Sequence, residues 1–177
     1  SRSAMDIEGL GPEWVAQFVD QGFVKSLPDL YSLTKADLIT LERMGEKLAQ
    51  NLLDAIATSK TPTLPRFLNG LGIRQVGEAT ANALADHFHD VSKLMAASLE
   101  ELQSVADVGP IVAQCIHDYF RRKVNRDAVE RLLKSVTIRK PEVKSQLFAG
   151  QVVCFTGAIE SMTRDDAKRI VVENGGK

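Results

Sequence analysis

The sequence has few of the residues that build disulfide frameworks, metal centres or membrane spans. Only two of its 177 residues are cysteines, Cys115 and Cys154, and without a Cys-x-x-Cys pair they cannot form a zinc site in this segment. No apolar run approaches the roughly 20 residues that cross a bilayer, and no signal-peptide pattern opens the chain. We therefore expect a soluble globular protein of a reduced cytosol, in which both cysteines are buried as small hydrophobic residues.

Positive charge is scarce over the first two thirds of the chain. The net charge of −1 hides two unlike segments. Residues 1–120 carry 9 Lys and Arg against 16 Asp and Glu, a net of −7, whereas residues 121–144 carry 9 against 3, a net of +6. Because a nucleic-acid-binding protein is normally basic, the acidic segment counts against that function unless the charges segregate by face.

One pattern recurs four times, centred on glycines that are spaced 34, 32 and 32 residues apart. In each copy an apolar residue lies four positions before the glycine, another lies one before it, and a small residue lies four after it. A near-constant period of this kind marks one supersecondary unit used four times. The copies are Ile7, Leu10, Gly11 and Val15; Leu41, Met44, Gly45 and Ala49; Ile73, Val76, Gly77 and Ala81; and Val105, Val108, Gly109 and Ala113.

Each copy predicts a helix, a tight turn and a second helix. The glycine supplies a backbone position that a side chain would obstruct, and a helix start follows it. Such a start leaves several N–H groups unpaired at the positive end of the helix dipole, and these groups form an anion site.

Capping signals divide the repeats into two pairs. Thr34 with Asp37 forms a capping box before the second hairpin, and Ser98 with Glu101 repeats it before the fourth. The turn-forming residues 59–65 separate the first pair from the second. We expect Asn125 to cap a further helix that ends near residue 135, which makes residues 1–135 one helical domain.

The C-terminal part of the chain follows a different pattern. Residues 136–148 are interpreted as a linker. The run QVVCFTG (151–157) predicts a buried strand, and SMTRDDAKRIVVENGG (161–176) predicts a helix capped by Thr163 and Asp166. Residues 149–177 therefore form an incomplete α/β piece, which we expect to be loosely held. The opening residues, SRSAMD, look like a cut inside a longer protein.

The repeated pattern resembles the helix-hairpin-helix family, whose hairpins carry two glycines separated by one residue. Only the first unit keeps both, as Gly9 and Gly11, and the others have Arg43, Gln75 and Asp107 at the first position. The resemblance implies that hairpin N–H groups bind phosphates of duplex DNA across the minor groove without reading sequence. The implied DNA-binding residues are Gly9, Gly11, Arg43, Gly45, Lys47, Arg74, Gly77 and Gly109, with the second and third hairpins binding most strongly because of their cations.

Residues 5–135 resemble, almost end to end, the four-hairpin domain of the bacterial NAD-dependent DNA ligases. The match rests on MDIEGLG (5–11), LERMGEKLAQNLL (41–53), RFLNGLGIRQVGEATANALADHF (66–88) and VADVGP (105–110). The C-terminal stretch looks like the opening strand and helix of a BRCT domain, with Thr156 and Gly157 at the strand end. The fold class is therefore mainly α, with four tandem helix-hairpin-helix units followed by a truncated BRCT-like piece.

The resemblance places catalysis outside this chain. Such ligases form a lysyl-adenylate at a Lys-x-Asp-Gly motif, and Lys35-Ala36-Asp37-Leu38 lacks the glycine. We therefore expect no catalytic residue, metal or cofactor here, whereas NAD, magnesium and zinc are implied for the longer enzyme. The segment is expected to be monomeric, without a membrane partner, and to act on double-stranded DNA in the bacterial cytoplasm at the nucleoid.

Two alternative functions stay open. The chain could be a helix-hairpin-helix module of another repair or recombination protein, or a helical protein-interaction scaffold that uses its acidic face. The basic cluster Arg121, Arg122, Lys123 and Arg126 is either a solvated helix end or a supplementary phosphate patch. The three histidines, His87, His89 and His117, are expected on helix surfaces.

Overall fold

The computed structural model describes residues 4–139, 148, 150–154 and 164–176. The chain divides into two compact units, Ser1–Ile138 and Arg139–Lys177, each described here by itself. The first unit extends to Ile138, three residues past the expected domain end, because the Val136 side chain is buried and the Thr137 N–H donates to the Lys60 carbonyl at 2.7 Å.

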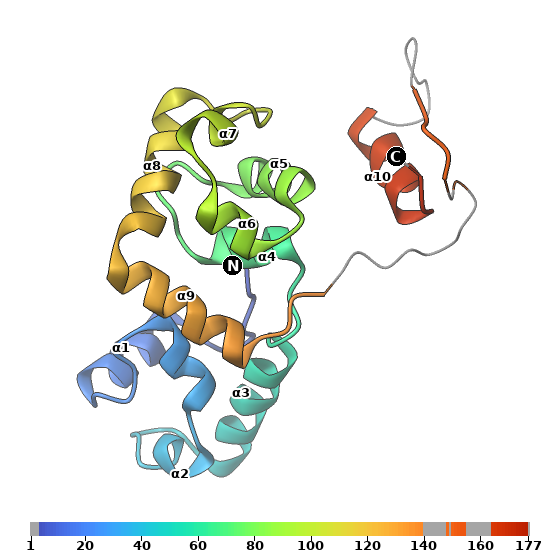
Figure 1. Ribbon diagram of the computed structural model, residues 1–177. Helices are drawn as coiled ribbons and strands as arrows, with labels where there is room; N and C mark the ends of the chain where they lie inside the picture. Colours follow the sequence, from blue (N-terminus) through green and yellow to red (C-terminus); the bar gives the residue numbers. More distant parts are fainter. Residues whose placement is uncertain (1–3, 140–147, 149, 155–163, 177) are drawn as a thin grey trace. The chain divides into compact units, whose positions relative to one another are not determined.

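The first unit is helical, as predicted (Figure 1). Its four hairpins lead into α1, α3, α5 and α8, and α2, α4 and α7 are the helices that precede the second, third and fourth hairpins. A 3₁₀ helix, η1, and the short helix α6 connect the hairpins of each pair. The bounds are α1 Pro12–Asp20, η1 Leu27–Ser32, α2 Lys35–Leu38, α3 Glu46–Thr58, α4 Leu64–Gly70, α5 Glu78–Phe88, α6 Val91–Ala96, α7 Leu99–Gln103, α8 Pro110–Arg121 and α9 Lys123–Ser135.

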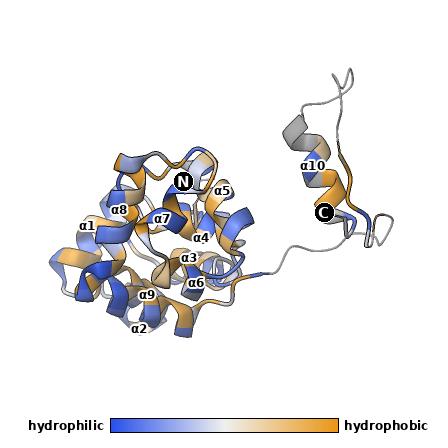
Figure 2. Ribbon diagram, turned by 45° about the horizontal axis from the view of Figure 1, so that its top comes forward, coloured by the Kyte–Doolittle hydropathy of each residue, from blue (hydrophilic) through white to orange (hydrophobic). Residues whose placement is uncertain are grey.

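The predicted grouping into two pairs corresponds to two hydrophobic cores. One core lies within the first half and includes Phe18, Leu38 and Leu52. The other lies within the second half and includes Phe67 and Ile116, together with residues of α9. Hydrophobic and hydrophilic residues alternate along these helices (Figure 2), as expected when each helix buries one face.

Side-chain contacts repeat between the second and fourth hairpins at an offset of 64 residues. Both predicted capping boxes form, at Thr34 with Asp37 and at Ser98 with Glu101. The chain therefore repeats not only its turns but also the bonds that fix the helices around them. Two further pairs match: Thr40 and Ser104 donate to the Asp37 and Glu101 carbonyls, and Gln50 and Gln114 donate to Asp54 and Asp118.

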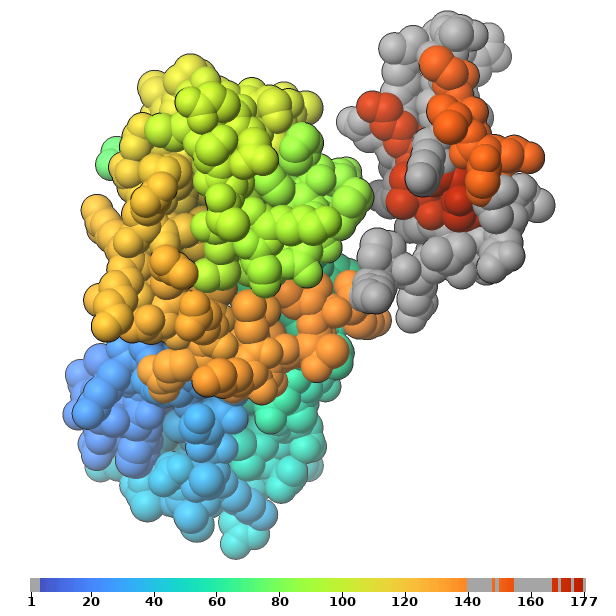
Figure 3. Space-filling view, in the orientation of Figure 1, coloured from blue at the N-terminus to red at the C-terminus, as the bar shows by residue number. Residues whose placement is uncertain are grey.

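Helix α9 lies across the junction of the two halves (Figures 1 and 3). The prediction that Asn125 caps this helix is wrong, because the helix begins at Lys123 with Arg122 as its N-cap residue. Asn125 instead donates its side-chain amide to the Tyr119 carbonyl at 2.9 Å, which ties α9 back to α8. The apolar side of α9 enters the second core through Val129 and Leu132.

A charged contact joins α9 to the first half. The Arg131 guanidinium donates to the Asp29 carboxylate at 2.6 Å, and the N–H of Ser26 donates to the same carboxylate at 2.7 Å. Burial alone raises the pKa of Asp29, but hydrogen bonds from Arg131, Lys25 and Ser26 outweigh it and lower the pKa from 3.8 to about 2. The ionised form of Asp29 is therefore the form that pairs with Arg131.

Asp29→Asn is expected to destabilise the protein by about 1 kcal/mol at pH 7. Because the folded pKa of Asp29 is depressed, its contribution is present above the unfolded pKa near 4 and is lost as the pH falls through about 2. Urea unfolding of both proteins at pH 7, 4 and 2.5 measures this difference. A difference that stays constant over that pH range would contradict the assignment.

The N-terminal segment packs on the second half. Met5 lies against Gly70, where an added Cβ would meet the Met5 Cγ at 2.9 Å. The Arg66 Nε donates to the Ala4 carbonyl at 2.8 Å, and its guanidinium lies 3.9 Å from the Asp6 carboxylate. These contacts hold the entry to the first hairpin against α4.

The second unit contains helix α10, Arg164–Glu173, within the predicted helical segment. Residues 151–154 of the predicted strand have no regular secondary structure, and its remaining residues, with the Thr156-Gly157 pair and the cap residue Thr163, lie outside the described residues. The prediction that both cysteines are buried is wrong for Cys154, which is exposed, while Cys115 is half-buried in α8. None of the described helices is long and apolar enough to span a membrane.

Candidate nucleic-acid interface

The four hairpin turns share one backbone hydrogen bond. In each turn the apolar residue before the glycine donates its N–H to the apolar residue three positions earlier. The N···O distances are 3.2 Å from Leu10 to Ile7, 3.2 Å from Met44 to Leu41, 3.0 Å from Val76 to Ile73 and 3.2 Å from Val108 to Val105. The apolar residues that define the sequence motif therefore also close the turn.

The third residue of every turn is left-handed. The φ angles are 80° at Gly9, 64° at Arg43, 67° at Gln75 and 62° at Asp107. The second residue of each turn does not have a positive φ, and a left-handed residue after it is typical of a type II turn. Loss of the first motif glycine in three hairpins therefore leaves the turn unchanged, although a non-glycine residue there costs about 1 kcal/mol.

The second glycine of the motif, which all four hairpins keep, occupies a different position, the N-cap of the following helix. Gly11, Gly45, Gly77 and Gly109 are all extended, with φ between −75° and −98°. This backbone conformation is open to any residue, and a Cβ added to any of the four would meet no atom of the chain within 4 Å. The prediction that a side chain would obstruct these positions is therefore wrong within the chain, whose own packing does not require glycine at any of the four.

Helix capping does not require glycine there either. Ser, Thr, Asp and Asn cap at least as well as glycine, and α2, α6 and α7 begin with such side-chain caps. No side chain caps α1, α3, α5 or α8. Their first N–H groups therefore have no side-chain acceptor, and without a Cβ at the N-cap the backbone is open on that side.

The second hairpin has the most cations near its turn. Arg43 and Lys47, the two cations that the sequence places beside this hairpin, are exposed there. The structure adds Lys35 of α2, whose Nζ lies 3.6 Å from the Glu46 carboxylate at the start of α3. Lys35 therefore partly neutralises the Glu46 carboxylate beside the uncapped N–H groups of α3. Sequence reasoning missed it because it lies ten residues before the glycine, beyond the motif.

The other three hairpins differ in charge and packing. Arg74 is exposed in the third turn, whereas the fourth turn carries Asp107. The residue four positions after the glycine is fully buried as Ala81 or Ala113, but Val15 of the first hairpin is 38% exposed. The first hairpin therefore repeats the turn without the close helix contact of the other copies.

Among the residues that the structure describes, no group of three or more His, Cys, Asp or Glu could hold a metal ion. His87 and His89 are exposed, as expected for helix surfaces, and His117 is half-buried on α8. The four repeats thus share a turn and an uncapped helix N-terminus rather than a set of metal ligands.

Comparison with known proteins agrees with this geometry. A family model described as a SAM-like helix-hairpin-helix tandem matches residues 1–58, and one described as a helix-hairpin-helix motif matches residues 66–129. Proteins named DNA ligase are similar over the whole chain: 51% identity over 179 residues in Myxococcus xanthus, 45% over 181 in Coxiella burnetii and 46% over 179 in Trichlorobacter lovleyi. These alignments cover 99–100% of this chain but 26–27% of each relative, so the chain spans about a quarter of their length.

Proposed function

We infer that this chain, which contains helix-hairpin-helix repeats and is homologous over its whole length to part of the bacterial DNA ligases, is the DNA-binding part of such a ligase. It holds double-stranded DNA through hairpin N–H groups that donate to minor-groove phosphates, and it does not read base sequence. Other domains of the longer enzyme transfer AMP from NAD to the 5′ phosphate of a nick and seal it, with magnesium and zinc as its metals. The fragment alone is inactive in ligation.

The observation that carries this proposal is the set of four extended, uncapped N-cap glycines. Local structure explains glycine at none of these positions, since φ is ordinary and a Cβ has open space. An external surface that comes close to the backbone explains all four at once. A phosphate backbone also matches the donors, because helix N-termini favour anions.

The acidic composition of the repeats is compatible with DNA binding, because the cations lie at the proposed contact sites. The cations Arg43, Lys47 and Arg74 lie at the two inner hairpins, and the contacts of neutral N–H groups need no net positive charge. We propose that these two hairpins supply most of the affinity. Gly9 and Gly11 of the first hairpin and Gly109 of the fourth add backbone contacts.

Fluorescence anisotropy with duplex DNA tests the proposal directly. Two 20-base-pair duplexes of unrelated sequence are expected to bind with the same dissociation constant, which rises steeply with salt. A helical scaffold that uses its acidic face predicts no binding of either duplex. Sequence-dependent binding would contradict contact through phosphates alone.

Arg74→Ala and Lys47→Ala are each expected to weaken duplex binding about threefold to tenfold, equally for both sequences. Each variant removes one phosphate contact and should lower the slope of log K against log salt by about 1. Lys134→Ala on α9 removes the same charge away from the hairpins and serves as the control. A loss confined to one duplex sequence would contradict a phosphate contact.

Asp107→Asn is expected to strengthen duplex binding about twofold to threefold. The change removes a negative charge from the turn, and asparagine tolerates the left-handed conformation, so the hairpin is retained. Asp127→Asn, an equal charge change on α9, should have a smaller effect. Equal gains in the two variants would show that only net charge matters.

In this proposal the chain acts in the bacterial cytoplasm, at the nucleoid. Its second unit belongs to a BRCT-like domain. We propose that the fragment is monomeric, which sedimentation equilibrium measures directly.

A further inference from the structure

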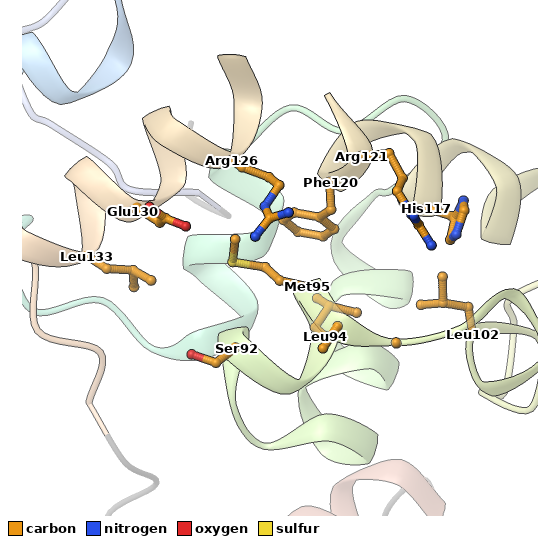
Figure 4. A pocket seen from close by; sticks show the side chains of 12 residues that line it. Ser92, Leu94, Met95, Leu102, His117, Phe120, Arg121, Arg126, Glu130 and Leu133 are labelled. Atoms are coloured by element: carbon orange, nitrogen blue, oxygen red, sulfur yellow. The ribbon is translucent and has the colours of Figure 1, made fainter. Parts of the chain in front are cut away.

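A hollow of about 480 Å³ lies between α6, α7, α8 and α9, and no hairpin turn lines it. Part of its lining is apolar, including Met95 and Phe120, and Arg121, Arg126 and Ser92 are among its polar residues. Figure 4 shows the two arginine side chains extending from α8 and α9 toward the side on which Ser92 and Met95 lie. The hollow thus combines two guanidinium groups with an apolar surface.

The described part of the chain does not neutralise these two arginines. No described carboxylate lies within 4.0 Å of either guanidinium, although Glu130 lines the same hollow one helical turn after Arg126. His117 lies on the same wall, and its buried Nδ1 has no hydrogen-bond partner among the described residues, with the Asp118 carboxylate 3.7 Å away. The positive groups of the hollow are therefore available to an anion from outside the chain.

The first half of the unit provides an internal comparison. There α9 contacts η1, and its Arg131 pairs with Asp29, the third residue of that short helix. Counted from the N-caps Ser26 and Asp90, the residue of α6 that matches Asp29 is Lys93. At this position η1 therefore carries a carboxylate that pairs with α9, whereas α6 carries a cation.

We propose that this hollow binds a phosphate-bearing nucleotide. Arginine forks match the geometry of phosphate oxygens, so Arg121 and Arg126 would hold the phosphate between them. A phosphate alone needs no apolar wall, whereas a base or sugar packs against apolar side chains such as the half-buried Met95. The volume also lies within the usual range of small-molecule sites.

The nucleotide is either free or one unit of a nucleic-acid strand. NMR spectra of the ¹⁵N-labelled chain distinguish these sources when adenosine 5′-monophosphate, adenosine, inorganic phosphate and a 5′-phosphorylated thymidine pentanucleotide are titrated separately. The amide signals of Ser92, Met95 and Phe120 are expected to shift with adenosine monophosphate. Arg121→Gln and Arg126→Gln should each weaken this binding about tenfold, whereas Arg122→Gln, which removes the same charge outside the hollow, should not change it.

Shifts with the mononucleotide alone identify a free nucleotide as the ligand, and stronger binding of the pentanucleotide identifies a strand. The proposal is overturned if neither nucleotide shifts these signals at millimolar concentration, if inorganic phosphate binds as well as adenosine monophosphate, or if Arg122→Gln weakens binding as much as Arg126→Gln. Melting temperatures show that each variant is folded. Because no hairpin residue lines the hollow, nucleotide binding should persist in a Gly45→Asp/Gly77→Asp variant, so this proposal and the proposed function fail separately.

Discussion

Gly45→Asp combined with Gly77→Asp is expected to weaken duplex DNA binding about 100-fold without lowering stability. Each aspartate places a carboxylate beside the N–H groups that should meet a phosphate, at a loss of about tenfold per hairpin. The fold should tolerate both changes, because each glycine is extended and a Cβ has no neighbour within 4 Å. Aspartate is also a better N-cap than glycine, so the melting temperature should stay the same or rise slightly.

Thr63→Asp is the matched control for this pair. Thr63 is the N-cap residue of α4, and its side chain makes no capping hydrogen bond. Aspartate at this position therefore also adds a carboxylate at a helix N-terminus, but outside the four hairpin turns. The dissociation constant of this variant for duplex DNA should change by less than about threefold, as expected for one added surface charge. If the double glycine variant binds duplex DNA as tightly as the parent chain, the hairpin N–H groups are not the contacts.

Ala81→Leu is expected to destabilise the protein by about 2 to 3 kcal/mol. Ala81 is fully buried one turn inside α5, where its N–H also donates to the Gly77 carbonyl at 2.9 Å. Larger side chains in a packed core force off-rotamer conformations and backbone shifts. Urea unfolding monitored by circular dichroism gives the free energy of unfolding of each variant.

Val15→Leu makes a larger side chain at the equivalent motif position of the first hairpin. Because Val15 is 38% exposed, the added methylene can extend into solvent, and the expected change is within about 0.5 kcal/mol. Equal destabilisation by both variants would mean that the small residue has the same packing role in every copy. The structure predicts that only the buried Ala81, and not the partly exposed Val15, has this packing role.

The regular parts of the fold could be predicted from short-range patterns. The glycine period gave the four hairpins, and the capping boxes at Thr34 and Ser98 gave the starts of α2 and α7. Both patterns encode backbone bonds within a few residues, so one stretch of sequence contains all of the information. The start of α9 was misplaced because Asn125 serves a contact with Tyr119 rather than a cap.

The candidate interface was only partly predictable. The sequence singled out its glycines and cations, but it did not show that Gln75 and Asp107 keep the left-handed turn of Gly9. Lys35 and the Arg131–Asp29 contact were missed because they depend on packing between segments, the second over about 100 residues of chain. The burial of Cys154 was predicted wrongly because the apolar run 151–157 was interpreted as a buried strand, whereas residues 151–154 have no regular secondary structure.

Backbone amide shifts on addition of duplex DNA test the central claim most directly. In ¹⁵N NMR spectra at low salt, we predict that the largest shifts occur at Gly45, Lys47, Gly77 and Ala79, with smaller ones at the first and fourth hairpins. Hydrogen bonding to phosphate should move these amide protons downfield, and raising the salt concentration should reverse the shifts. Shifts confined to α9 or to the acidic helix faces, with the hairpin amides unchanged at saturating DNA, would contradict the account.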